Sequence, residues 1–198
     1  MTLLVVQSNA SRIDVAIDTQ GKASDGTWPE FSKLVHFAAP NMLIAARGDR
    51  QLLAWLHDYF FSASVTVRFD DARDSIPHAC ALICDRCESA GHYAELQFLL
   101  AGHSQREREM IAIMFNLETR TRTLDDDRLW DDRRFWYAPW EASMGRCPAW
   151  VDDPSVMAIA RRQAAHLKGL GEAGGGRLLV ATLSATSYQV RDLGPIVA

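Results

Sequence analysis

Four residues near the N-terminus are of types that together could hydrolyse an amide bond, beginning with Thr2. Methionine is generally removed in cells when the next residue is small, so Thr2, which follows Met1, can become the N-terminal residue. Its hydroxyl and its free α-amine then belong to one residue, and the amine, with a reference pKa of about 8, can act as general base for the hydroxyl. The pattern predicts attack by a threonine on a carbonyl carbon.

The amine of such a threonine needs a neighbouring cation that lowers its pKa, and the cation needs a carboxylate that holds it in place. Asp18 lies at the end of one predicted strand and Lys33 at the beginning of another, so they are candidates for these roles. Gly48 lies between a predicted strand and a predicted helix, where its N–H can stabilise an oxyanion without a side chain in the way. Each residue alone is more simply a turn or surface residue, and only the combination predicts a site. Lys33 is expected to act through its charge and to contribute little packing.

The elements that must position these residues are strand pairs alternating with helices. Short apolar runs separated by turn-forming residues predict four hairpins, at 3–7 with 12–17, 33–37 with 42–46, 96–101 with 110–117, and 178–183 with 188–192. Apolar residues at helical spacing predict helices over 49–60, 75–87 and 156–170. Residues 124–134 contain five Asp and three Arg, which predicts a solvated loop. No linker or repeat interrupts this order, so the sequence predicts one α+β domain over residues 1–198.

The composition of the 198 residues is that of a globular protein, with 48% hydrophobic and 23% charged residues. A net charge of −4 gives no basic excess that could neutralise a phosphate backbone, so nucleic acid is not expected as a main partner. No apolar run approaches the roughly 20 residues of a membrane helix, and no secretory signal is visible. These observations predict a soluble, cytoplasmic protein without a membrane partner.

Three of the four cysteines, Cys80, Cys84 and Cys87, are spaced so that they share one face of a predicted helix. The Cys84-x-x-Cys87 pair, with His78 and His92 close in sequence, permits a zinc or redox interpretation. A zinc site with four ligands normally takes its second pair from a separate turn, so small buried cysteines are the favoured interpretation. Neither a metal nor a cofactor is expected.

Two further segments have both a functional and a structural interpretation. Residues 169–176 contain five glycines, but they follow a predicted helix whose C-terminal carbonyls repel an anion, so a phosphate site is not favoured. A cluster of aromatic residues could form the floor of a substrate cleft. It includes Trp136, Tyr137, Trp140 and Trp150. The favoured interpretation places these aromatic residues at a core edge or a subunit interface, where such side chains are enriched.

Several segments of the chain resemble proteasome β-type subunits, peptidases whose nucleophile is an N-terminal threonine. The opening of the family is matched by TLLVV at 2–6, VAIDT at 15–19, SKLVHF at 32–37 and PNMLIAARGD at 40–49. QFLLAG at 97–102 is similar to the strand after the family's second helix, and GGGRLLVATL at 174–183 to its glycine turn and penultimate strand. With Thr2 directly behind Met1, the chain is most similar to the bacterial members built from one kind of subunit, the HslV peptidase and the betaproteobacterial proteasome homologues.

The resemblance implies an N-terminal-nucleophile (Ntn) hydrolase, an α+β protein with a four-layer αββα sandwich of two antiparallel sheets between layers of helices. It assigns Thr2 as nucleophile and base, and the Gly48 N–H as oxyanion donor. Lys33 would lower the pKa of the Thr2 amine or hydroxyl, and Asp18 would pair with Lys33. Ser143 is the nearest match to the serine of the family's Gly-Ser-Gly segment.

The resemblance also implies a homo-oligomer, a double ring of 14 or alternatively 12 copies whose sites face an inner chamber. The substrates would be peptides or unfolded proteins, and the partner an ATP-dependent unfoldase. One of the differences is that the family has an aspartate followed three residues later by a serine where this chain has LGEAGG at 170–175, with Glu172 its only acid. The alternative function is therefore a ring-forming relative of weak or no activity that acts as a binding or structural assembly. A small-molecule amidase is a third.

Overall fold

The computed structural model describes residues 3–21, 27, 29–62, 68–129, 134–138, 144, 149–172 and 174–196, with the backbone alone for 134–138. In chain order these residues form β1 (Leu4–Asn9), β2 (Arg12–Asp18), β3 (Leu34–Phe37), β4 (Met42–Gly48), α1 (Arg50–Ser62), α2 (Phe69–Ala90), β5 (Glu95–Ser104), β6 (Glu109–Glu118), β7 (Thr123–Arg128), β8 (Arg134–Ala138), α3 (Asp153–Gly169), β9 (Arg177–Ser184) and β10 (Tyr188–Pro195). None of the described helices is long and apolar enough to cross a membrane.

The described strands form two five-stranded antiparallel sheets. One has the order β10-β9-β2-β1-β8 and the other the order β3-β4-β5-β6-β7. The four predicted hairpins are confirmed as β1–β2, β3–β4, β5–β6 and β9–β10. The predicted α+β class is confirmed with them. β2 is the central strand of its sheet and pairs with both β1 and β9, so its last residue, Asp18, lies between two neighbouring strands.

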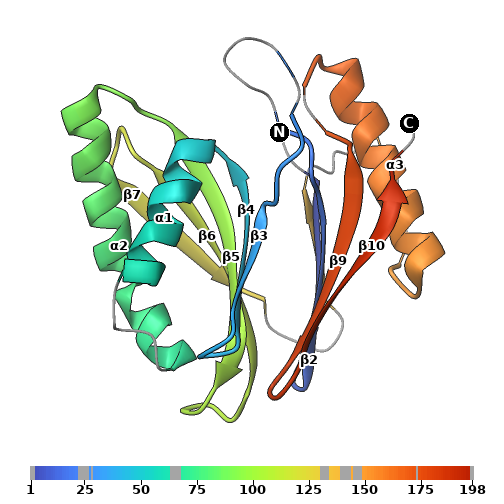
Figure 1. Ribbon diagram of the computed structural model, residues 1–198, viewed down its shortest axis with the longest axis horizontal. Helices are drawn as coiled ribbons and strands as arrows, with labels where there is room; N and C mark the ends of the chain where they lie inside the picture. Colours follow the sequence, from blue (N-terminus) through green and yellow to red (C-terminus); the bar gives the residue numbers. More distant parts are fainter. Residues whose placement is uncertain are drawn as a thin grey trace.

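The alternation of side chains along β4 explains how the sheets and helices pack. Met42, Ile44 and Ala46 belong to a cluster between their sheet and the helices α1 and α2. Leu43 and Ala45 point the other way, into a cluster shared with β1 and β2 of the other sheet. A third cluster joins that other sheet to α3. In Figure 1, α1 and α2 accordingly lie along one sheet and α3 along the other.

Polar contacts join the two sheets where the β3–β4 turn meets the β9–β10 hairpin. Asn41, whose φ of 58° is in the left-handed region, donates from Nδ2 to the Ser184 carbonyl at 2.9 Å. Asn41 Oδ1 lies 2.9 Å from His36 Nε2, and the His36 ring stacks on Tyr188 with 3.8 Å between the ring centroids. This end of the molecule is therefore fixed by side chains from both sheets.

Part of the segment predicted as a solvated loop is strand, so that prediction is wrong for residues 124–128 and for Arg134, which begins β8. Residues 124–128 belong to β7, which pairs with β6 at the edge of the second sheet. The side chains of residues 125–127, all aspartates, are exposed, because only the backbone of an edge strand has to pair. Arg128 is held by the carboxylates of Glu107 and Glu109. Residues 130–133 lie outside the described residues.

The helix α2 is longer than predicted, beginning at Phe69 rather than at residue 75. Cys80, Cys84 and Cys87 lie buried in the cluster beneath it, which confirms their interpretation as core residues. Burial raises the pKa of the Cys80 thiol to about 12, so this cysteine is protonated and unreactive at neutral pH.

The aromatic cluster is only partly described. Trp150 is buried in the cluster beneath α3, with 6% of its surface exposed. A neighbouring subunit therefore cannot use its surface, and the interface interpretation is wrong for Trp150, which lies in the core. Trp140 lies outside the described residues, and for Trp136 and Tyr137 only the backbone of β8 is described.

The Asp70 carboxylate fastens the start of α2 to the β5–β6 turn. Its Oδ1 accepts a hydrogen bond from Ser104 Oγ at 2.7 Å, and its Oδ2 accepts from the N–H groups of Gln105 and Arg106 at 3.0 and 3.1 Å. Burial acts to raise the pKa of Asp70, but these hydrogen bonds and the charge of Arg73 outweigh it. The pKa of Asp70 therefore lies below its ordinary value.

We expect Asp70→Ala to lower the free energy of unfolding near pH 7 by about 1–3 kcal/mol, because three donors lose a charged acceptor. A carboxyl whose pKa is lowered by folding stabilises fully above its unfolded pKa, about 3.9, and this stabilisation is lost as pH falls through the folded value. Denaturation by urea should therefore show that the loss of unfolding free energy in Asp70→Ala becomes smaller below about pH 4. The control is Asp71→Ala, an exposed neighbour that should change stability little. A deficit independent of pH would contradict the charged network.

Candidate active site

Asp18 and Lys33 form a buried ion pair between the two sheets. Lys33 Nζ lies 2.9 Å from Asp18 Oδ1, and the two side chains are 2% and 0% exposed. Asp18 comes from the end of β2 in one sheet, and Lys33 directly precedes β3 in the other. The structure thus brings together two residues that lie 15 positions apart in the chain.

Backbone N–H groups hold both oxygens of the Asp18 carboxylate. Leu3 N donates to Oδ1 at 2.9 Å, and Gly175 N donates to Oδ2 at 3.1 Å. The carboxylate is therefore fixed by the start of β1 and by the turn before β9, as well as by Lys33. Charge-assisted hydrogen bonds of this kind are stronger than neutral ones, so they set the carboxylate in one orientation.

The Lys33 side chain is part of the interior. Its ammonium donates to the Gln20 carbonyl as well as to Asp18, and it lies 5.6 Å from the centroid of the Phe31 ring. Its backbone is tied to β4, because Ala46 N donates to the Lys33 carbonyl at 3.0 Å. The expectation that Lys33 contributes little packing is wrong, since a side chain this buried and this bonded is part of the fold.

Burial shifts both members of the pair toward their neutral forms. It raises the pKa of Asp18, and Lys33 together with the two N–H donors offsets only part of that rise. It lowers the pKa of Lys33, and Arg47 lowers it further, while Asp18 acts in the opposite direction. The pKa values of Asp18 and Lys33 therefore lie closer together than those of an exposed aspartate and an exposed lysine.

Gly48 occupies a position that only glycine fits. Its φ is +116°, and a Cβ there would lie 2.5 Å from the Glu95 carbonyl oxygen. The next residue, Asp49, donates its N–H to the same oxygen at 3.1 Å and accepts hydrogen bonds from Gln51 N and Leu52 N at the start of α1. The chain between β4 and α1 is thereby held in one conformation beside the Asp18–Lys33 end of the molecule.

Sequence reasoning missed the role of the glycine-rich segment. Gly175 contacts the Asp18 carboxylate, and a Cβ on Gly176 would lie 2.6 Å from Thr19 Oγ1. That hydroxyl donates to Glu30 Oε2 and accepts from Arg177 N, both at 2.9 Å. Three consecutive glycines were the available signal, because they indicate a place where backbone closely approaches another element.

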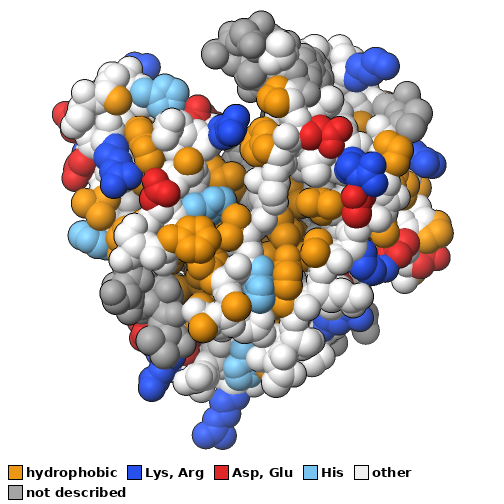
Figure 2. All heavy atoms as spheres, in the orientation of Figure 1, with side chains coloured by type: hydrophobic (Ala, Val, Ile, Leu, Met, Phe, Trp, Pro, Cys, Tyr) orange, Lys and Arg blue, Asp and Glu red, His pale blue; other side chains and the backbone are white. Residues whose placement is uncertain are grey.

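Two of the predicted site residues, Thr2 and Ser143, lie outside the described residues. The arrangement that the structure describes therefore consists of Asp18, Lys33 and Gly48. Among the residues described, no group of three or more His, Cys, Asp or Glu side chains is placed to hold a metal ion. Figure 2 shows the surface hollowed at the end of the molecule where β2 ends and α1 begins.

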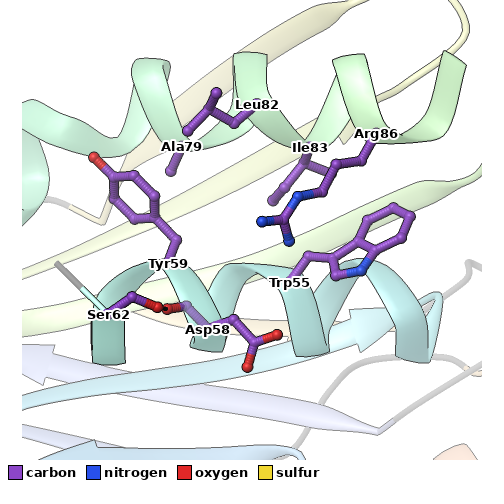
Figure 3. A pocket seen from close by; sticks show the side chains of 8 residues that line it. All are labelled: Trp55, Asp58, Tyr59, Ser62, Ala79, Leu82, Ile83 and Arg86. Carbon is purple, nitrogen blue, oxygen red and sulfur yellow. Dashed lines mark hydrogen bonds between the residues drawn. The ribbon is translucent and has the colours of Figure 1, made fainter. Parts of the chain in front are cut away.

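A separate cavity of about 270 Å³ lies between α1 and α2, away from the ion pair. Figure 3 shows its lining side chains, which include Trp55 and Tyr59 from α1 and Leu82 and Arg86 from α2. The Arg86 guanidinium lies 5.9 Å from the Trp55 ring. The cavity is on the helical outer layer and shares no residue with the candidate site.

Comparisons with known proteins give a structural match only. No protein-family model matches the sequence, and no curated protein is significantly similar to it. Anbu (ancestral beta-subunit) from Yersinia bercovieri superimposes with a TM-score of 0.65 at 12% identity, over 97% of this chain and 87% of that one. The fold is that of Anbu. Anbu is a homologue of proteasome β-subunits, so the predicted resemblance is confirmed at the level of the fold.

Two structures from Hyphomicrobium sp. strain MC1 agree with this match. Its Anbu gives a TM-score of 0.63 at 11% identity, over 99% of this chain and 88% of that one. An Anbu (Gly-1) mutant from the same strain gives 0.61 at 13% identity, over 100% and 89%. Agreement across nearly the whole chain at so low an identity means that the two-sheet architecture, rather than a shared local motif, produces the match.

We expect Lys33→Met, which keeps much of the side chain's volume, to lower the free energy of unfolding near pH 7 by about 3–5 kcal/mol, because it leaves Asp18 buried without its cation. Without Lys33 the pKa of Asp18 should rise further, and a carboxyl whose folded pKa is raised destabilises above that value. The difference in the free energy of unfolding between wild type and Lys33→Met should therefore become smaller as pH falls through the raised pKa of Asp18.

Urea denaturation of wild type and Lys33→Met over a series of pH values measures this. The matched control is Lys168→Met, which removes an exposed lysine from α3 and should have a small effect at every pH. A deficit of less than about 1 kcal/mol, or one that widens toward acid pH, would show that the ion pair does not stabilise the fold in this way.

Proposed function

We propose that the protein is an N-terminal threonine peptidase of the Ntn-hydrolase type, a single αββα domain over residues 1–198. The observation that carries the proposal is the buried Asp18–Lys33 pair, whose carboxylate accepts the Leu3 N–H. Thr2 is joined by its peptide bond to that same nitrogen, so the pair is anchored one residue from the proposed nucleophile. The Anbu fold supports the proposal, and packing of helices on the outer faces of two sheets fits the four-layer sandwich.

In the proposed reaction the α-amine of Thr2 accepts the proton of the Thr2 hydroxyl as the oxygen attacks a peptide carbonyl. The Lys33 ammonium lowers the pKa of the amine or hydroxyl, and Asp18 holds Lys33 in place. The Gly48 N–H donates to the developing oxyanion. The proton then passes to the departing amine, which leaves an ester on Thr2 that water hydrolyses. Ser143 belongs to the same proposed site.

The first expected outcome is that Met1 is removed and that the protein cleaves short fluorogenic peptides. Intact mass measures the first, and the rate of fluorophore release measures the second. Thr2→Ala should abolish cleavage, because nucleophile and proton acceptor belong to one residue, and Lys33→Arg should lower it by about 10²-fold or more. Thr2→Ser, which keeps hydroxyl and amine, should retain activity. Full retention of Met1 in the native protein would contradict the peptidase proposal.

The second expected outcome is a double ring of 14 copies, with 12 as the alternative, whose inner chamber receives peptides or unfolded proteins from an ATP-dependent unfoldase. Confinement follows from the chemistry, because an unselective peptidase free in solution would cut the exposed loops of other proteins. Light scattering should give a mass of several hundred kilodaltons. A stable monomer near 22.1 kDa at micromolar concentration would contradict the ring, whether active or serving only as an assembly.

A further inference from the structure

The cavity between α1 and α2 follows from the spacing of residues on the two helices. Trp55 and Tyr59 lie one turn apart on α1, and Ala79, Ile83 and Arg86 lie about one turn apart on α2, so each set lies along one side of its helix. The two sides face each other across the cavity (Figure 3). Because Ala79 has no side chain beyond its Cβ, the helices leave a space between them there.

The walls of this cavity are mostly apolar, and its inner wall belongs to the core. Ala79 and Ile83 are 0% and 2% exposed. Trp55 and Tyr59 are half-buried and pack against the same core cluster, whereas Leu82 is 40% exposed and forms part of the rim. Pockets that bind small molecules have this composition, with apolar and aromatic walls and a few placed polar groups.

One cation points into this apolar space. The Arg86 side chain extends from α2 toward α1 (Figure 3), and its guanidinium carbon lies 5.9 Å from the centroid of the Trp55 ring. That distance is within the range of a cation–π contact, which helps to hold the guanidinium over the cavity. In the described portion of the chain no carboxylate forms an ion pair with Arg86. Its N–H donors are therefore available to a ligand.

The carboxylates close to Arg86 in sequence or in space are directed elsewhere. Asp85 pairs with Arg122 at 2.7 Å, and Glu88 contacts the same arginine at 3.3 Å. Asp58 also lines the cavity, but it is exposed, and its carboxylate lies on the side of α1 away from α2 (Figure 3). Water weakens the field of a carboxylate placed in this way. Arg86 is thus the charged group that a ligand between the helices meets.

The volume of the cavity limits the size of that ligand. A cavity of about 150 Å³ is enough for benzene. The present cavity, at about 270 Å³, has room for one aromatic ring with a short chain. It is smaller than the roughly 300–1,000 Å³ of pockets for drug-sized ligands, and an α-helix, about 10 Å across, does not enter it. The occupant is therefore a small molecule rather than a segment of a partner protein.

We propose that the cavity between α1 and α2 binds a small aromatic carboxylate, in which a short alkyl chain joins the ring to the acid group. The ring packs among Trp55, Tyr59 and Ile83, and the carboxylate accepts hydrogen bonds from Arg86. Burial of the ring supplies most of the affinity. The charge-assisted hydrogen bonds select an acid over a neutral amide of the same shape.

The probes are hydrocinnamate, a phenyl ring on a three-carbon acid, and its neutral isostere hydrocinnamide. Isothermal titration calorimetry on the whole protein should give a Kd of about 0.1–1 mM for hydrocinnamate, as expected for a ligand of so few atoms. The amide should bind about tenfold more weakly or worse. Sodium chloride should weaken binding of the acid and not of the amide, because salt screens the charge of Arg86 in a cavity open to solvent.

Arg86→Gln should weaken binding of hydrocinnamate by about tenfold or more and leave the affinity for hydrocinnamide within about twofold. The matched control is Arg161→Gln, which removes the same charge from an exposed position on α3 and should bind both probes as wild type does. Leu82→Trp enlarges a residue of the rim and should abolish binding of both probes. Its control is Leu170→Trp, which enlarges an exposed leucine at the end of α3.

Circular dichroism checks that each variant is folded, and the exposure of Arg86 and Leu82 makes these substitutions compatible with the fold. Equal affinity for acid and amide, or full affinity for the acid in Arg86→Gln, overturns the proposal. Binding that survives Leu82→Trp places the ligand elsewhere and overturns it too, as does the absence of binding by both probes. The peptidase proposal is tested separately, by cleavage of peptides, and none of these outcomes changes it.

Discussion

One buried carboxylate, that of Asp18, joins segments of this protein that lie far apart in the chain. It accepts hydrogen bonds from the start of β1, from the turn before β9 and from Lys33, which belongs to the other sheet. Removing a carboxylate from water is costly unless charge and hydrogen bonds replace the lost hydration. The fold therefore has to bring three distant segments to one point, and the site is a consequence of that requirement.

Close backbone approaches make this convergence possible. Gly48, Gly175 and Gly176 all have positive φ values, and at Gly48 and Gly176 a Cβ would lie within 2.6 Å of another atom. Side chains at these positions would push β4 away from β5, or the glycine turn away from β2. The opposite end of the sandwich is held differently, by the hydrogen bonds of Asn41 and the stacking of the His36 ring on Tyr188. The two sheets are thus joined by hydrogen bonds and ring stacking at one end and by an ion pair at the other.

The electrostatics of the site follow from which charges are compensated. The Asp18–Lys33 pair is internally balanced, and the negative charge of Asp18 also favours the protonated form of the half-buried Arg47. Burial shifts the pKa values of Asp18 and Lys33 toward each other, so the pair stabilises the fold less than its short distance suggests. The same burial lowers the pKa of Lys33 below its ordinary value, which is typical of lysines at functional sites.

The sequence by itself determined most of the helices and strands and the types of residue that form the candidate site. Apolar periodicity and turn residues located four hairpins and three helices, because these signals are local to each segment. It failed at β7, where a run of aspartates forms a strand because the backbone of β6 offers a partner and the side chains stay in water. The pairing of one strand with another depends on the tertiary structure, and the composition of a segment does not predict it.

Residue types suggested that Asp18 and Lys33 belong together, but only the tertiary structure decided how. The burial of Lys33, the hold of Gly175 on Asp18 and the position of Arg50 on Phe31 all arise between segments far apart in the chain. The sequence could state which groups were available for chemistry. Their distances, their burial and their ion pairing depend on how two sheets pack face to face, and no local pattern encodes that packing.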